Sequence, residues 1–169
     1  EGPPGRGRQL RAGADAARGD WFLFLHADTV LAPGWSDGVR AFIERPNAAE
    51  TAGYFEFALD DPSSSARRLE RLVRWRNRLF GLPYGDQGLL ISKRLYSRIG
   101  GYRDFSLMED VDIVRRLGRG SLAAIDFRAT TSAVRFQQDG YWVRPMRNLA
   151  CLALFYIGVP ADAIKRVYG

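Results

Sequence analysis

The sequence predicts an α/β fold in which helices flank a mixed, Rossmann-like sheet. Residues 21–25 (Trp-Phe-Leu-Phe-Leu) are apolar at every position, a pattern typical of a central strand covered on both faces, as in parallel sheets. Along the chain, segments with helical spacing alternate with short apolar strands, which favours an α/β arrangement. Because the strands after Thr51 are shorter and more polar, we expect the sheet to be mixed.

The first half of the chain contains three predicted helices and two predicted strands. Residues 8–18 are rich in alanine, a strong helix former, and Gly19 follows as a glycine C-cap. The strand at 21–25 comes next. Residues 33–44 carry apolar side chains at helical spacing, and 51–59 read as a strand. Asp61-Pro-Ser-Ser then resembles a cap and first turn, so a third helix is expected to run from there to Phe80.

The second half continues the alternation and ends in helices. We predict strands at 89–92, 122–127 and 130–136, and helices at 93–98, 109–118, 141–157 and 160–168. No linker, repeat or low-complexity tract divides the chain. The sequence is therefore predicted to form a single domain over residues 1–169, with C-terminal helices from about 140 to 169.

Composition excludes several classes of protein. At 46% hydrophobic residues the chain can bury a core, so intrinsic disorder is not expected. The net charge of +6 comes almost entirely from arginine; either phosphate binding or a GC-rich coding bias explains that preference. No block of like charges occurs, which argues against a nucleic-acid partner. With one cysteine, Cys151, the chain cannot form an internal disulfide, which favours a reducing compartment and hence the cytoplasm.

The segment after the first predicted strand is the strongest candidate site. In open α/β sheets, ligands bind outside the carboxyl ends of the strands, and here the strand is followed by His26 and Asp28. Side chains two residues apart on an extended backbone point to the same face. An imidazole and a carboxylate placed in this way could hold a divalent cation together with nucleotide phosphates. Alternatively, Asp28 caps the turn into the next helix and His26 is a hydrogen-bonded polar residue.

A second acidic segment opens the predicted helix at 109–118 and contains Glu109, Asp110 and Asp112. Asp110 shares a helical face with apolar residues, so we expect it to lean toward the core or a cleft. Asp112 lies four residues before Arg116, the spacing of a solvated ion pair. A carboxylate in the first helical turn is kept ionised by the helix dipole and by free backbone N–H groups, which is the state that a general base requires.

Two glycine-containing loops complete the candidate set. Gly85, Asp86 and Gln87 present a carboxylate and an amide on a constrained loop, which suits hydroxyl recognition, although a plain turn explains them too. Near the first residue of the chain, Arg6 and Arg8 alternate with glycines at a helix start, where an anion could bind.

These motifs, in this order, resemble the family 2 glycosyltransferases, inverting enzymes of the GT-A fold that use nucleotide-diphosphate sugars. Residues 23–29 look like the Asp-x-Asp element of that family, with His26 at the first Asp. Residues 85–102 look like its acceptor-side loop, and residues 108–112 like its catalytic Glu-Asp motif. The His-Ala-Asp-Thr and Gly-Asp-Gln-Gly variants are similar to a bacterial subgroup of glycosyltransferases, some of them linked to arsenosugar biosynthesis.

The resemblance implies a role for each candidate. Asp28, with His26, would hold a divalent cation (Mn²⁺ or Mg²⁺) on the diphosphate of a nucleotide-diphosphate sugar donor. Asp110, next to Glu109, would take the proton of the acceptor hydroxyl in one inverting displacement. We assign the donor phosphates to Arg6, Arg8 and Asp28, and the acceptor to Gly85, Asp86 and Gln87. The opening strand, helix and second strand of the family are expected to have no counterpart upstream of Glu1.

Two other functions stay open at this stage. The arginine-rich helix at 67–80 and the apolar segment at 149–159 fit a peripheral membrane or polyanion-binding module, although such stripes usually belong to a core-packed helix with a solvated face. Carboxylates and a divalent cation also serve a nucleotidyltransferase. The acceptor is expected to be a small molecule or a lipid-linked sugar; a lipid-linked acceptor would place the protein at the inner face of the membrane.

Overall fold

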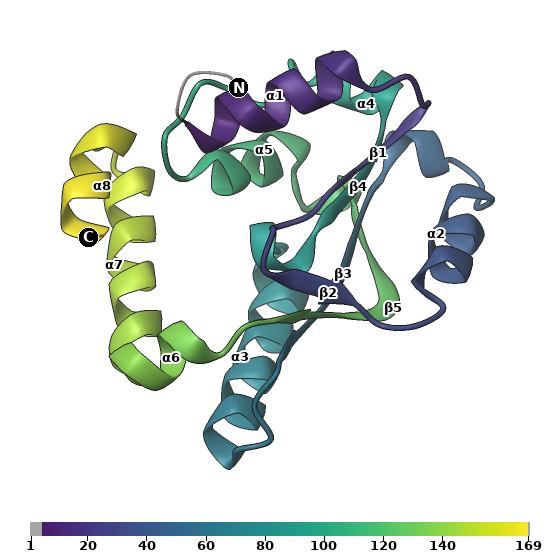
Figure 1. The fold of residues 1–169 in the computed structure, drawn as a ribbon. Helices are drawn as coiled ribbons and strands as arrows, with labels where there is room; N and C mark the ends of the chain where they lie inside the picture. The colour runs from purple at the N-terminus through teal and green to yellow at the C-terminus, as the bar shows by residue number, and fades with distance from the viewer. Residues whose placement is uncertain (1–4, 169) are drawn as a thin grey trace.

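A five-stranded mixed sheet forms the centre of the fold in the computed structural model, which describes residues 5–168 (Figure 1). The strands are β1 (Trp21–Phe24), β2 (Thr29–Leu31), β3 (Ala52–Leu59), β4 (Leu89–Ser92) and β5 (Leu122–Thr131), in the spatial order β1-β4-β3-β5-β2. Only β3 and β5 run parallel; the other neighbours are antiparallel. The predicted α/β class with a mixed sheet is confirmed.

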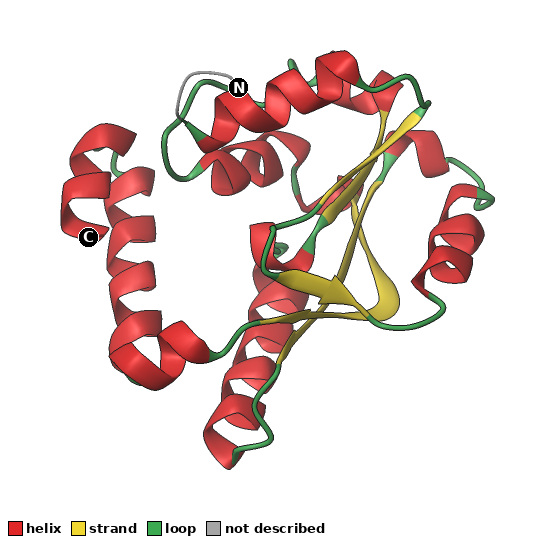
Figure 2. Cartoon of the chain, in the orientation of Figure 1, coloured by secondary structure: helices red, strands yellow, loops and turns green. Residues whose placement is uncertain are grey.

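Helices cover both faces of this sheet (Figure 2). They are α1 (Arg6–Ala16), α2 (Trp35–Ile43), α3 (Ser64–Phe80), α4 (Lys93–Arg98), α5 (Glu109–Leu117), α6 (Val134–Asp139), α7 (Val143–Tyr156) and α8 (Ala161–Tyr168), with short 3-10 turns η1 (Ala48–Glu50), η2 (Gly85–Gln87) and η3 (Arg119–Ser121). The side chains of β4 point alternately to the two faces of the sheet. Leu90 packs with Phe42 of α2 on one face, whereas Leu89 and Ile91 pack with α4 and α5 on the other. The sheet therefore has no solvated face in its middle.

The apolar run at β1 was predicted to be a central strand, and within residues 5–168 that prediction is wrong. β1 lies at one edge of the sheet and pairs only with β4, antiparallel. Its two faces are nevertheless both covered. Phe22 packs against Tyr96, and Phe24 against Tyr96 and Tyr102, with ring centroids 4.9–5.6 Å apart, while Leu23 packs in the α2 layer. Burial on both faces, rather than two strand neighbours, explains the uninterrupted apolar pattern.

The predicted strands at 122–127 and 130–136 are corrected to one strand followed by a helix. β5 continues through Thr131, and its register against β3 shifts after Ile125, which leaves Asp126 and Phe127 in a bulge. A bulge interrupts the alternation of buried and exposed positions, so the sequence pattern looks like a strand end. Beyond Thr131 the chain turns into α6.

Helices α6, α7 and α8 form a C-terminal layer at one side of the sheet, drawn in green to yellow in Figure 1. Cys151 of α7 and Ile164 of α8 are fully buried and pack against the start of α5 at Met108 and Val111. Within residues 5–168, no helix combines the length and hydropathy that crossing a membrane requires.

The arginine-rich helix α3 has a packed face and an exposed apolar face. Ala66, Leu69 and Val73 are buried against β3. Trp75 and Phe80, by contrast, are 59% and 57% exposed. The helix is therefore a core element that also presents apolar side chains to solvent among its arginines.

The junction between β3, α3 and the C-terminal layer is tied by Asp61. Its carboxylate accepts hydrogen bonds from the Ser63 amide (2.7 Å), from Gln137 of α6 (3.2 Å) and from the Tyr141 hydroxyl. The Tyr141 hydrogen bond, followed by that of Ser63, lowers the pKa of Asp61 to about 2. The ionised carboxylate therefore holds α6 against the first turn of α3.

Replacing this carboxylate should loosen the C-terminal layer. We expect Asp61→Asn to lower the melting temperature at pH 7. The folded-state pKa lies below the ordinary value, so the contribution of Asp61 is present above about pH 4 and is lost as the pH falls toward 2. The difference in melting temperature between wild type and Asp61→Asn, measured by circular dichroism, should therefore become smaller as the pH falls over that range. Asp126→Asn, at an exposed position in the bulge of β5, is the control; an equal loss in both variants would contradict the assignment.

Candidate active site

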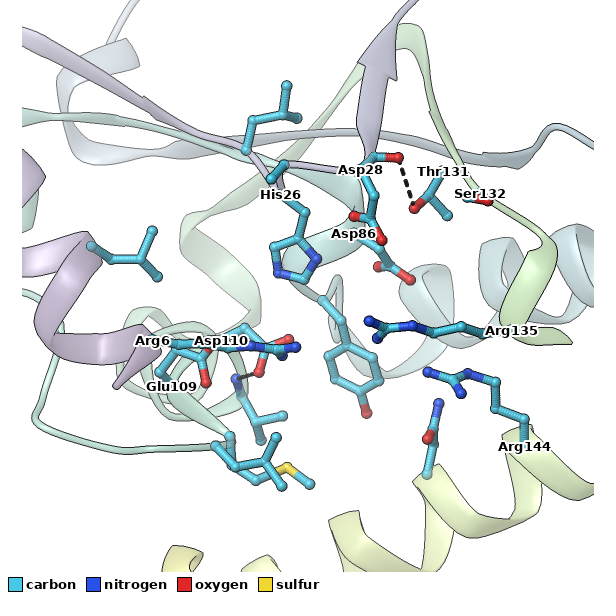
Figure 3. Close-up of a pocket in the computed structure, with 18 of the residues that line it drawn as sticks. Arg6, His26, Asp28, Asp86, Glu109, Asp110, Thr131, Ser132, Arg135 and Arg144 are labelled. Carbon is cyan, nitrogen blue, oxygen red and sulfur yellow. Dashed lines mark hydrogen bonds between the residues drawn. The ribbon is translucent and has the colours of Figure 1, made fainter. Parts of the chain in front are cut away.

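A cleft of about 660 Å³ lies where the sheet meets the C-terminal layer (Figure 3). It is bordered by α1, the segment after β1, the η2 loop, the start of α5, the end of β5, and α6 and α7. Its titratable lining residues are Arg6, His26, Asp28, Tyr84, Asp86, Glu109, Asp110, Arg135 and Arg144. Four carboxylates and three arginines thus share one cavity.

Asp110 is the most firmly oriented of these carboxylates. Its Oδ2 accepts a hydrogen bond from the Gly85 amide (2.9 Å), and its Oδ1 accepts one from the Val111 amide (2.8 Å). It lies in the first turn of α5, where the free N–H groups favour a negative charge. Hydrogen bonds from N–H groups to a carboxylate are stronger than neutral ones. Asp110 is therefore fixed in position while still lining the cleft.

Gly85 is required at this point because the loop passes close to His26. A Cβ at Gly85 would lie 2.4 Å from His26 Nε2, which is inside van der Waals contact. The close approach brings the Gly85 amide to Asp110 and the imidazole to the same loop. A single glycine thereby links the end of β1 to the start of α5.

Glu109 lies beside Asp110 but has a different environment. Its side chain is buried, with 2% exposure, and its Oε2 has no hydrogen-bond partner among the described residues. Burial, followed by the neighbouring Asp110 charge, raises the pKa of Glu109 to about 7. Glu109 is thus partly protonated near neutral pH, so the pair carries less negative charge than two ordinary carboxylates would.

His26, Asp28 and Asp86 gather on the side of the cleft next to β1 (Figure 3). Asp28 is exposed, and the Thr131 hydroxyl donates to its backbone carbonyl (3.4 Å). Asp86 has a buried Oδ1 without a hydrogen-bond partner among the described residues. Burial raises the pKa of Asp86, while the charges of Arg76 and His26 act in the opposite direction. Among residues 5–168, His, Cys, Asp and Glu side chains form no group of three or more that could hold a metal alone.

Three predicted candidates lie elsewhere or act differently. Arg8 is outside the cleft lining and forms an exposed ion pair with Asp104. Gln87 is buried, with 1% exposure; it donates to the Phe55 carbonyl (2.9 Å) and accepts from Asn77 (3.0 Å), so it braces β3 against α3. Gly85 contributes its amide to Asp110 and is not among the lining residues.

The predicted solvated ion pair of Asp112 is corrected to a buried one. Asp112 is 6% exposed and accepts hydrogen bonds from Arg116 (2.6 Å) and Arg103 (3.2 Å). Because two arginines bind its carboxylate in the first turn of α5, Asp112 stabilises the fold. The helical spacing predicted the Arg116 partner correctly, but it carries no information about the loop that covers the pair.

The wall formed by α6 and α7 was not recognised in the sequence. It brings Arg135, Arg144 and Asn148 to the cleft, opposite His26. Arg135 falls in the segment predicted as a strand, and Arg144 in a helix whose partner was unknown. The one signal available was the abundance of arginine, which composition alone does not assign to any site.

The architecture is that of a GT-A-like α/β domain with a carboxylate-rich cleft at strand ends. A comparison with families of known proteins agrees with it: the model for glycosyl transferase family 2 matches residues 2–107. The chain belongs to this family, and glycosyl transfer is its activity. A search of curated proteins found no match. The matched range ends just before Glu109, so the acidic start of α5 and the C-terminal layer lie beyond it.

The raised pKa of Glu109 predicts a pH-dependent cost to stability. Above the unfolded value of 4.5, ionising the buried carboxyl penalises the folded state. Glu109→Gln should therefore stabilise the protein by about 3 kcal/mol at pH 8 and by less than about 1 kcal/mol at pH 5. Urea unfolding at both pH values measures the difference. Glu44→Gln, at an exposed position after α2, should show neither effect, and a Glu109→Gln variant that is less stable at pH 8 would contradict the assignment.

Adding one methyl group at Gly85 should displace the loop that orients Asp110. We expect Gly85→Ala to lower kcat by about 10- to 100-fold, the equivalent of losing one hydrogen bond to a charged group. Gly13→Ala is the matched control because a Cβ there meets no atom within 4 Å. Transfer rates and melting temperatures should be measured together. An unchanged kcat in folded Gly85→Ala would show that this contact is dispensable.

Proposed function

We propose that the protein is an inverting hexosyltransferase that moves a sugar from a nucleotide-diphosphate donor to an acceptor hydroxyl. The observation that carries this proposal is Asp110, a carboxylate held by two backbone amides at the wall of the cleft. Its position suits a general base for a hydroxyl that enters the cavity. Glu109 beside it, with a pKa raised to about 7, is partly neutral near pH 7 and so adds less repulsion than a second full charge would.

The reaction proceeds in one displacement. The acceptor hydroxyl gives its proton to the Asp110 carboxylate, and the acceptor oxygen forms a bond to the anomeric carbon. On the opposite face, the bond from that carbon to the diphosphate oxygen breaks, and the electron pair leaves with the nucleoside diphosphate. Configuration at the anomeric carbon is inverted, and no enzyme nucleophile is used.

A divalent cation, Mn²⁺ or Mg²⁺, is proposed at Asp28. Mg²⁺ is commonly bound by one or two carboxylates, with substrate phosphates and water completing its shell, so the absence of a three-residue group in the described chain is compatible with it. Asp28 is exposed in the cleft, and His26 lines the same wall. When bound, the cation would stabilise the charge that grows on the departing diphosphate. Arg6, which also lines the cleft, adds positive charge near α5.

Peripheral membrane attachment is a second candidate function, supported by exposed apolar residues on two helices. Leu72, Trp75, Leu79 and Phe80 on α3, and Trp142, Val143, Met146, Leu149 and Ile157 on or next to α7, are at least 44% exposed. Basic, amphipathic helices of this kind bind anionic lipid surfaces. The two functions are compatible if the acceptor is lipid-linked.

The test combines donor, metal and base in one experiment. The protein would be incubated with UDP- and GDP-sugars and with small-molecule or lipid-linked acceptors, in Mn²⁺ or EDTA, and release of nucleoside diphosphate measured. Asp110→Asn should lower kcat by about 10²- to 10⁴-fold, since it removes the base. Asp28→Ala should lower donor affinity in the presence of the cation.

Asp37→Asn, at an exposed position in α2, should leave both quantities unchanged. Release of pyrophosphate in place of nucleoside diphosphate would identify a nucleotidyltransferase. Full transfer by folded Asp110→Asn would contradict the proposed base, and unchanged liposome binding in that variant would separate attachment from catalysis.

A further inference from the structure

We propose that the wall formed by Tyr84, Arg135, Arg144 and Asn148 is a subsite for an anionic group, phosphate or carboxylate, carried by the acceptor. The inference rests on the proposed glycosyl transfer and deepens it by naming a class of acceptor. All four residues line the cleft. In Figure 3, the side chains of Arg135 and Arg144 enter it from the side opposite His26 and Arg6.

The arginines of this wall differ in how they are held. Arg144 and Arg147 both bind the Asp139 carboxylate, at 2.8 and 2.6 Å. Arg144 is 8% exposed and lies over the Phe136 ring, 5.4 Å from its centroid, so its position is fixed. Arg135 is exposed and forms no ion pair or hydrogen bond with any other residue in the described range 5–168. A guanidinium with five donors and no partner is suited to a bidentate oxyanion.

Two buried polar atoms beside the arginines also have no hydrogen-bond partner within the described residues. They are the Tyr84 hydroxyl, which can donate to an oxyanion, and Asn148 Oδ1, which accepts and therefore suits a hydroxyl elsewhere on the ligand. Buried polar atoms are nearly always hydrogen-bonded in folded proteins, to the protein, to water or to a ligand. The Tyr84 ring is held in place by the Arg76 guanidinium, 3.9 Å from its centroid. Burial raises the pKa of Tyr84 to about 12, so its hydroxyl remains a donor at neutral pH.

The subsite is adjacent to the reacting position. Tyr84 directly precedes Gly85, whose amide binds Asp110. Tyr84 and Asp110 line the same cleft, and the Asp110 charge contributes to the raised pKa of Tyr84, so a ligand group on the Tyr84 hydroxyl shares the cavity with the base. The β1 side of the cleft carries the exposed carboxylate of Asp28, which repels an anion unless a cation is present. Charge thus separates the two substrates: the diphosphate with its cation lies at Asp28, and the acceptor anion at α6 and α7.

The experiment measures anion binding with the donor subsite filled. The full chain would be saturated with UDP or GDP, whichever binds, and Mg²⁺; inorganic phosphate and glucose 6-phosphate would then be titrated by calorimetry at constant ionic strength. Both should bind the saturated complex. Arg135→Ala should weaken phosphate binding about tenfold or more, the effect of losing hydrogen bonds to a charged group, and leave the nucleotide Kd within about twofold.

Arg128→Ala is the matched control, since Arg128 is an exposed arginine on β5 outside the cleft lining; it should change neither constant. Phosphate that binds only when nucleotide is absent, or an Arg135→Ala variant that weakens nucleotide as much as phosphate, would overturn the proposal in favour of a donor role. Equal phosphate binding by Arg135→Ala and wild type would also overturn it. Because these are binding constants, wild-type protein that binds phosphate at this wall but releases no nucleoside diphosphate would show the subsite without the reaction, which distinguishes failure of the proposed reaction from failure of the subsite.

Discussion

The hydrogen bond from the Gly85 amide to Asp110 is the contact on which the cleft depends. It joins the loop before β4 to the first turn of α5, two elements 25 residues apart. The loop is itself held by the buried side chain of Gln87, which forms hydrogen bonds with Phe55 of β3 and Asn77 of α3. The orientation of the carboxylate is therefore set by the sheet, and not by the helix alone. Any element that shifts this loop also shifts His26, because the glycine leaves no space between them.

The acidic pair at the start of α5 shows how burial divides two neighbouring carboxyl groups. Glu109 is buried without a full set of hydrogen-bond partners, whereas Asp110 receives two amides and faces the cavity. Burial raises the pKa of the first group, whereas the second is oriented toward the cavity by its two amide donors. This difference is a consequence of α5 entering the core at this point, between the aromatic cluster that packs on β1 and the buried face of α7.

Local signals in the sequence were sufficient for most elements and for the acidic half of the cleft. The strand at 89–92 and the helix at 93–98 have the predicted bounds, because a run of three apolar residues followed by Ser92 as an N-cap is a local signal. The edge position of β1 was not predictable, since an apolar run reports burial and not the number of strand neighbours. The bulge in β5 interrupts the alternating pattern of the strand, so the sequence did not indicate where β5 ends and α6 begins. Arg135 and Arg144 reach the cleft only through tertiary packing of the C-terminal layer, to which no periodicity points.

The cleft is built from two parts of the chain that differ in how they are held. The β1, η2 and α5 side is built on the sheet, whereas the α6–α8 side is attached through Asp61, the cluster around Cys151, and contacts such as the hydrogen bond from Ser106 to Asp162. The two hydrogen bonds that orient Asp110, from the Gly85 and Val111 amides, come entirely from the first of these parts. Under the proposed acceptor subsite, the residues that would select the acceptor and the carboxylate that would activate it lie on differently held parts of the chain, so the C-terminal segment is the part to exchange in order to alter the acceptor range.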